Sequence, residues 1–199
     1  MIPVSRFVAN KALDFDGWLA ARRNGVTATE VARAATKSGF DEVVASFAAT
    51  EEIPDNPYME FGRRMEGPIA LWLKDLWEVM PNEWLISAAG NPQHLATPDG
   101  LSLKHDAISE IKTTGKDFGT IPVQYKRQVQ WQLYVTGTHY CYFAWLLRAE
   151  ASDGSFVPGW IDPKYTVIER DDKMVEELLD VADRLWAAKQ AALAIPAGS

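Results

Sequence analysis

Cysteine and histidine are scarce in this sequence, with one cysteine and three histidines among 199 residues. The lone Cys141 can form no internal disulfide and cannot supply a cysteine-rich zinc or iron–sulfur centre. Its place in the apolar run 140–147 indicates a buried, small hydrophobic side chain. His94, His105 and His139 lack the helical spacing of zinc ligands, so we expect them on the surface or in loops, without a zinc site.

Long apolar segments are also missing. The sequence contains no run of 18 apolar residues, and its first residues lack the basic and then apolar order of a secretory leader. Internal repeats, low-complexity tracts and linker-like stretches are absent as well. We therefore expect a single α/β domain over residues 1–199, in a soluble cytoplasmic protein that has no membrane partner.

Positive charge is in deficit, because 20 Lys and Arg residues face 27 Asp and Glu residues and leave a net charge of −7. Duplex binding depends largely on neutralising phosphates with Lys and Arg, so the total argues against nucleic acid. Basic side chains gathered in a cleft can nevertheless bind DNA beneath an acidic exterior. A carboxylate cluster for divalent cations would add negative charge of its own. Composition therefore leaves nucleic-acid binding open.

Helical signals dominate the first 80 residues. Residues 14–23 form one predicted helix, and Thr27-Ala-Thr-Glu30 is a capping-box pattern that begins a second helix ending near residue 37. Asn56-Pro57 supplies an N-cap and a first-turn proline for a long helix to about residue 79. The predicted core stripe of this long helix consists of Phe61, Met65, Ile69, Trp72 and Leu76.

Strand signals follow from residue 83 onward. Short apolar or β-branched runs predict strands at residues 84–88, 107–113, 140–147 and 165–169. A helix over residues 122–135 interrupts them and places Tyr125, Gln128 and Gln132 on one face. A last helix begins at Asp171-Asp172. This order predicts an α/β (α+β) fold in which helices at the N-terminus precede a central mixed β-sheet flanked by helices.

Two segments carry candidate chemistry. Asp99 lies in the turn Thr97-Pro98-Asp99-Gly100-Leu101, and Glu110-Ile111-Lys112 follows Asp99 after eleven positions. Alternate residues of a strand point the same way, so Glu110 and Lys112 share one face while Ile111 points into the core. Asp99 can meet Glu110 if the two segments are adjacent strands of a hairpin. Two carboxylates at one point suit Mg²⁺, and the lysine would orient an attacking water or offset charge on a phosphate.

Taken alone, this pattern favours a simpler interpretation, an exposed hairpin with a turn aspartate and a solvent-facing Glu–Lys pair. The residue types are common and the spacing is loose, so an isolated match has little specificity. Further motifs along the chain change that judgement.

Seven motifs occur in order along most of the chain. They are Trp18-Leu-Ala-Ala-Arg22, Gly25-Val-Thr-Ala-Thr29-Glu30, Gly62-Arg-Arg-Met-Glu66, the turn that contains Asp99, Glu110-Ile-Lys112, Tyr125-Lys-Arg-Gln128-Val-Gln130 and Val167-Ile-Glu-Arg-Asp171. Together they resemble the lambda-exonuclease (viral recombinase) family over roughly residues 14–190. This resemblance implies a PD-(D/E)XK nuclease with a restriction-endonuclease-like core.

The resemblance implies a metal site and a catalytic lysine. By position, Asp99, Glu110 and the backbone carbonyl of Ile111 would bind metal, and Lys112 would be the catalytic lysine. Glu66 matches a helix-borne acidic residue that supports a second metal or its water. We therefore expect a two-metal Mg²⁺ site in which Mn²⁺ substitutes.

The resemblance also implies a pocket for a terminal 5'-phosphate. Arg22, Thr29 and Gln128 match the positions that hold this phosphate, and Tyr125 matches a residue beside it. Thr29 stands where serine is often found, but its hydroxyl keeps the donor and the acceptor. No strand-splitting residue is assigned within residues 37–55.

The activity implied by the resemblance is 5'-to-3' digestion of one strand of duplex DNA from a 5'-phosphorylated end. Mononucleotides would be released, and the 3' single-stranded tails would serve single-strand annealing in phage-type homologous recombination. The implied partners are double-stranded DNA, a single-strand annealing protein and two further copies of the chain in a homotrimeric ring. A phage or prophage gene acting in the cytoplasm of a bacterial host is implied as well.

Two alternatives stay open at this point. A structure-specific or restriction-type endonuclease could use the same fold, and intact circular DNA would distinguish it because an exonuclease leaves such DNA uncut. A catalytically silent DNA-binding subunit would be indicated by loss of a metal carboxylate or of Lys112, and the sequence retains all of them.

Overall fold

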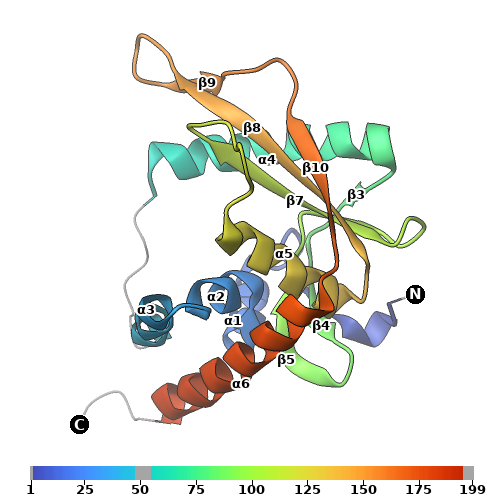
Figure 1. The fold of residues 1–199 in the computed structure, drawn as a ribbon, viewed down its shortest axis with the longest axis vertical. Helices are drawn as coiled ribbons and strands as arrows, with labels where there is room; N and C mark the ends of the chain where they lie inside the picture. The colour runs from blue at the N-terminus through green and yellow to red at the C-terminus, as the bar shows by residue number, and fades with distance from the viewer. Residues whose placement is uncertain (1, 48–54, 195–199) are drawn as a thin grey trace.

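The computed structural model of the chain describes residues 2–47 and 55–194 (Figure 1). Within them the helices are η1 (Val4–Arg6), α1 (Phe15–Arg23), α2 (Ala28–Ala34), α3 (Lys37–Phe47), α4 (Pro57–Trp77), α5 (Val123–Thr136) and α6 (Asp172–Ala194). The strands are β1 (Phe7–Asn10), β2 (Val26–Thr27), β3 (Met80–Pro81), β4 (Trp84–Ala88), β5 (Asn91–Ala96), β6 (Gly100–Ser102), β7 (Ala107–Thr114), β8 (Tyr140–Glu150), β9 (Phe156–Pro158) and β10 (Lys164–Glu169).

The strands form two sheets. The larger sheet has the order β10-β8-β7-β6-β3, with β9 paired to the far part of β8. Its centre is the parallel pair β7–β8, and its other pairs are antiparallel. The smaller sheet has the order β1-β4-β5-β2. The larger sheet is therefore mixed, and together with its flanking helices it confirms the predicted α+β class.

Three helices begin where the sequence predicts, because each start carries a side chain that satisfies free backbone N–H groups. Asp14 accepts from the amide of Gly17 at 2.9 Å, and Thr27 and Glu30 form the predicted capping box at the start of α2. Asn56 accepts from the first amides of α4, which ends after Trp77 close to the predicted boundary.

Helix α5 lies between the two sheets and is the centre of the molecule (Figure 1). One side of α5 packs its Val129 and Leu133 against Phe143 of β8. Its Trp131 is fully buried and donates from Nε1 to the carbonyl of Leu95 in β5 at 3.0 Å. Helix α4 covers the opposite face of the larger sheet, and α2, α3 and α6 enclose the remaining core with α5.

Two predicted positions are wrong. Leu76 is 49% exposed, and Leu73 takes its place in the core of α4 with no exposed surface. A helix turns about 100° per residue, so a stripe drawn over about four turns with steps mostly of four residues drifts away from the buried face. His94 is not at the surface but is 2% exposed, with its Nδ1 3.0 Å from the hydroxyl of Tyr134. His105 and His139 are exposed, as expected.

Several short elements were not predicted. Strands β1, β2, β3, β6 and β9 have two to four residues each, too few for a periodic signal. Strand β5 reads Asn-Pro-Gln-His-Leu-Ala, a polar run that forms a strand through its pairing with β4 and β2. Helix α3 occupies part of the segment 37–55, and residues 48–54 of that segment lie outside the described residues. No helix in the described part of the chain is long and apolar enough to span a membrane.

Candidate functional site

The site begins where the edge of β7 becomes open. Strand β6 pairs with β7 only as far as Ser109, whereas β8 accompanies β7 to Thr114. Beyond Ser109, the carboxylate of Asp99 takes the place of a strand partner, because its Oδ2 accepts from the amide of Ile111 at 2.6 Å. A β-carbon on Gly100 would lie 2.4 Å from Oγ of Ser109, so glycine permits this close approach.

Glu110 is buried on β7 with 2% exposure, yet both of its carboxylate oxygens have hydrogen-bond donors. Its Oε1 accepts from Gln128 Nε2 at 2.6 Å and from the ammonium of Lys112, and its Oε2 accepts from Gln132 Nε2 at 2.6 Å. Gln128 and Gln132 lie four residues apart on α5, so one helix face supplies both amides. A buried carboxylate needs such partners because an unpaired buried charge is costly.

Lys112 projects from the same side of β7 as Glu110. Its ammonium also lies 5.2 Å from the centre of the Tyr125 ring, a cation–π arrangement. Burial acts to lower the pKa of Lys112, but the charges of Glu110 and Asp99 and the hydrogen bond to Glu110 outweigh it and raise the pKa above its ordinary value. The lysine is therefore a fixed positive charge at neutral pH.

Whereas the surroundings of Lys112 favour its charged form, those of Asp99 favour its neutral, protonated form. Burial and the nearby charge of Glu110 raise the pKa of Asp99 well above its usual range, although Lys112 and the amide of Ile111 act in the other direction. The charge of Glu66 also contributes to this raised pKa. The site therefore holds more negative charge than its own donors balance, and a cation would relieve the excess.

The open edge of β7 leads into a cavity of about 670 Å³. Ile111 and Lys112 of β7 line it together with Glu66 of α4 and Arg148 of β8. Glu66 and Lys112 thus line the same cavity from different elements, α4 and β7. In the part of the chain that the structure describes, no group of three or more His, Cys, Asp or Glu side chains is arranged to hold a metal ion. Asp99 and Glu110 are neighbouring carboxylates, since the charge of Glu110 acts on the pKa of Asp99.

The predicted phosphate-binding residues are only partly brought together. Gln128 contacts Glu110, whereas Arg22 lies in the last turn of α1 and stacks on Trp18, with 4.4 Å from its guanidinium carbon to the ring centre. Burial lowers the pKa of Arg22, with an opposing effect from the charge of Glu30. Thr29 is exposed in the first turn of α2. Helix α2 packs against α5, but within residues 2–47 and 55–194 no hydrogen bond links Arg22 or Thr29 to Gln128.

The turn between Arg22 and Thr29 is held from the far end of the chain. Lys189 of α6 is buried, and its Nζ donates to the carbonyl of Gly25 at 2.7 Å and to Oε1 of Glu30 at 3.1 Å. The other carboxylate oxygen of Glu30 caps Thr27. The capping box is therefore also the anchor of α6.

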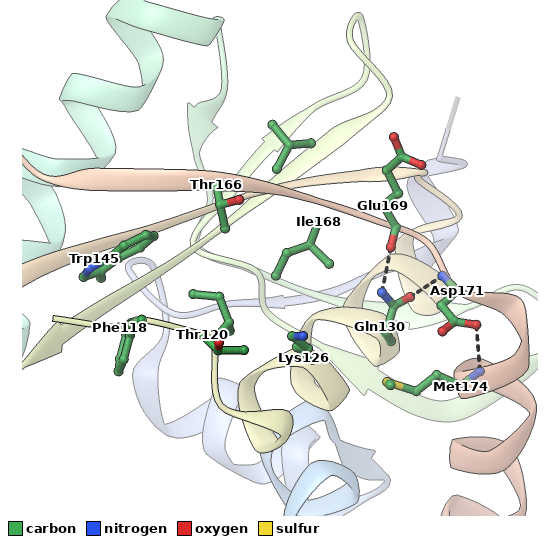
Figure 2. Close-up of a pocket in the computed structure, with 13 residues that line it drawn as sticks. Phe118, Thr120, Lys126, Gln130, Trp145, Thr166, Ile168, Glu169, Asp171 and Met174 are labelled. Atoms are coloured by element: carbon green, nitrogen blue, oxygen red, sulfur yellow. Dashed lines mark hydrogen bonds between the residues drawn. The ribbon is translucent and has the colours of Figure 1, made fainter.

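A second cavity of about 570 Å³ lies beside β10 and the first turns of α5 and α6 (Figure 2). Figure 2 shows Gln130 on one side of it, with its amide donating to the carbonyl of Glu169 and its oxygen accepting from the amide of Asp171, each at 2.7 Å. Two of the seven motifs therefore meet here. None of the predicted site residues lines this cavity. The two hydrogen bonds of Gln130 join α5 to the end of β10 and the start of α6.

Sequence reasoning placed Gln132 on the helix face of Gln128 but assigned it no role at the site, although it completes the shell of Glu110. It missed Arg148 altogether. The predicted strand ends at residue 147, while β8 continues to Glu150 because β9 pairs with its last residues.

A mixed sheet with a carboxylate pair and a lysine at the open edge of its central strand is the arrangement of a restriction-endonuclease-like nuclease. Residues 17–139, more than half of the chain, match the YqaJ-like viral recombinase domain. The chain therefore belongs to the YqaJ-like viral recombinase family, and the resemblance predicted from the sequence is confirmed. It is an enzyme of the exonuclease class found in phage recombination.

Solved structures of exonucleases share this fold. An alkaline exonuclease from Laribacter hongkongensis is 26% identical with a TM-score of 0.67, over 88% of this chain and 93% of that one. The same enzyme in complex with dAMP gives 24% identity and a TM-score of 0.66 over the same shares. A phage-related exonuclease from Haemophilus somnus 129PT gives 11% identity and a TM-score of 0.64, over 85% of this chain and 95% of that one. No curated protein sequence matches this chain.

The charge excess at Asp99 predicts a gain in stability when the carboxylate is removed. We expect Asp99→Asn, measured by urea unfolding in EDTA at neutral pH, to raise the free energy of unfolding by about 1 to 3 kcal/mol, because the amide oxygen can still accept from Ile111 without a buried charge. The folded-state pKa of Asp99 is raised, so the wild type loses stability as pH rises above the unfolded-state pKa, and the variant does not.

The advantage of Asp99→Asn should therefore shrink as the pH is lowered toward about 4, where the unfolded chain also holds the proton. The exposed Asp75→Asn is the control and should change stability little at any pH. If Asp99→Asn is less stable than the wild type at neutral pH, the site does not hold an excess of negative charge.

Proposed function

We propose that this protein is a Mg²⁺-dependent exonuclease that digests one strand of duplex DNA from a 5'-phosphorylated end. It would release mononucleotides and leave 3' single-stranded tails for an annealing protein. The observation that carries this proposal is the buried pair Asp99 and Glu110 beside the charged Lys112, at the open edge of β7 and next to a cavity.

The donor set fits a hard divalent cation. Two carboxylates with excess negative charge suit Mg²⁺ or Mn²⁺, which bind oxygen ligands and retain several waters. Asp99, Glu110 and the carbonyl of Ile111 would hold the cation, and Glu66, which lines the same cavity as Ile111 and Lys112, would support a second one or its water. When bound, the metal lowers the pKa of a coordinated water and offsets charge on the phosphate.

The protein's own side chains have separate tasks in this proposal. Lys112 keeps its proton, because its pKa is raised, and so it can stabilise charge that develops on the scissile phosphate. Gln128 and Gln132 hold Glu110 in place through its two oxygens. Because this shell is formed by α5 packing on β7, the site is organised before substrate arrives.

The direction of digestion rests on a proposed end-binding pocket. Arg22 offers planar fork geometry for a terminal phosphate, Thr29 a hydroxyl and Gln128 an amide, with Tyr125 beside them. The packing of α2 on α5 supports a common location for these groups. Because α5 contacts both sheets, this proposal also treats the chain as a single domain.

Digestion of end-labelled linear duplex DNA tests the activity, and Lys112→Ala tests the site. We expect the wild type to release 5'-labelled mononucleotide only when Mg²⁺ or Mn²⁺ is added, and to leave closed circular plasmid intact. Lys112→Ala should lower kcat by about a hundredfold or more with DNA binding nearly unchanged, because the lysine acts mainly in the transition state.

Lys104→Ala, which removes an exposed lysine from the turn before β7, is the matched control and should retain the wild-type rate. Nicking of the closed plasmid would instead favour an endonuclease. Binding without any cleavage by the wild type would favour a silent DNA-binding subunit.

A second prediction concerns the end of the substrate. The wild type should digest a 5'-phosphorylated end about tenfold or more faster than a 5'-hydroxyl end, since a charge-assisted hydrogen bond contributes about 1.5 to 3 kcal/mol. Arg22→Ala should reduce this ratio toward one, and the neighbouring exposed Arg23→Ala should leave it unchanged. Equal wild-type rates on the two ends would remove the phosphate pocket.

A third prediction is that the working form is a ring of three subunits around the DNA. A chain with a net charge of −7 attracts a polyanion weakly, whereas three inward-facing copies would concentrate basic side chains around one channel. Such rings use two different patches on each subunit. Sedimentation at working concentration should give three chain masses, and a monomer that digests long DNA processively would contradict the ring.

A further inference from the structure

Arg148 lies on the far part of β8, on the sheet face that α4 covers. Its guanidinium carbon is 4.4 Å from the ring centre of Tyr58 in the first turn of α4 and 5.2 Å from that of Phe156 in β9. These two rings are themselves 5.0 Å apart. Arg148 is thus held by aromatic faces contributed by two separate elements.

This mode of attachment leaves the charge and the N–H groups of Arg148 available. Cation–π stacking uses the flat face of the guanidinium, while its donors point outward from the edge. Among residues 2–47 and 55–194, no carboxylate lies within ion-pair distance of Arg148. Its basic neighbours differ, because Arg63 is paired with Asp55 and Arg64 donates to the carbonyl of Phe156.

The free donors of Arg148 lie close to the proposed catalytic residues. Arg148 lines the same cavity as Lys112 and Glu66. Gln128, a member of the proposed end-binding pocket, approaches Glu110 from α5 on the other face of the sheet. Arg148 and Gln128 therefore approach the strands β7 and β8 from opposite faces of the larger sheet.

We propose that Arg148 binds an internal phosphate of the strand being digested, on the 3' side of the scissile bond. This inference rests on the proposed function, in which the 5' end occupies the side of Gln128. The strand must then leave the catalytic residues through the cavity that Arg148 lines. An Arg fork matches phosphate oxygens, and the stacked rings fix the side chain in advance, so little conformational entropy is lost on binding.

A phosphate contact at Arg148 would also help to explain how a chain with an acidic composition binds DNA. Arg63, Lys112 and Arg148 line this one cavity against Glu66 alone among the acidic residues, while the whole chain carries −7. Basic side chains are therefore gathered where the substrate passes. Arg148 is the member of this group that is neither catalytic nor paired with a described carboxylate.

The test is a double-mutant cycle, in which removal of the Arg148 side chain is combined with removal of the charge of one substrate phosphate at a time. Duplexes carry one uncharged methylphosphonate at the second, third or fourth linkage from a 5'-phosphorylated end, and single-turnover release of the terminal nucleotide is measured. For the wild type, one of these linkages should slow release by about ten- to hundredfold. Arg148→Ala should show that loss on unmodified DNA and little further loss at the same linkage.

A matched control separates this role from a structural one. Arg184 also stacks on a ring, with 5.3 Å from its guanidinium carbon to the centre of Phe40, but it is paired with Asp180 on α6. Arg184→Ala should therefore keep the wild-type response to every linkage. Arg148→Gln replaces Arg148→Ala if the latter fails to fold, since it keeps a planar, uncharged group against the rings. Loss of one phosphate contact should also make the dependence of kcat/KM on salt shallower.

The inference is overturned if each methylphosphonate slows Arg148→Ala by the same factor as the wild type, because the two losses would then be independent. That result is distinct from failure of the proposed function. In the latter case the wild type itself would release no 5'-terminal nucleotide from unmodified DNA.

Discussion

The buried carboxylate of Glu110 sets the arrangement of the whole molecule. A charge in the middle of a sheet is tolerated only if donors surround it, and here they come from Lys112 on the same strand and from Gln128 and Gln132 on α5. Helix α5 must therefore lie across β7 with that face inward. Because α5 also anchors the smaller sheet through Trp131, the helix that completes the carboxylate shell is also the helix that connects the two sheets.

The second constraint is the early end of the pairing between β6 and β7. A complete strand at this edge would satisfy the amide of Ile111 and close the sheet. The carboxylate of Asp99 satisfies that amide instead, so a functional group occupies the place of a structural one. The pKa of this carboxylate is raised by burial and by the charge of Glu110, and the edge of β7 beyond it borders the cavity that Ile111 and Lys112 line.

Capping residues and helical spacing predicted those parts of the fold that depend only on residues close together in the sequence. Asn56 caps α4, and the spacing of Gln128 and Gln132 puts both amides on one helix face. Strand alternation put Glu110 and Lys112 on one face, and Asp99 could meet them only if its segment paired with theirs, a condition that the pairing of β6 with β7 fulfils. His94 and Arg148 could not be placed in this way, because their surroundings come from α5, α4 and β9, which are distant in sequence. The roles of Arg22 and Thr29 came from family resemblance and await the end-preference measurement.

The anchoring of Glu30 by Lys189 has a consequence for the order in which the protein is made. Glu30 and Lys189 are 159 positions apart, and at about 5 to 20 residues per second the ribosome needs on the order of 10 to 30 s to synthesise that interval. During this time the turn between Arg22 and Thr29 exists without the ammonium that holds it. A nascent chain therefore contains Asp99 and Glu110, the proposed metal ligands, before its N-terminal turn is secured, and α6 is the helix that completes this contact.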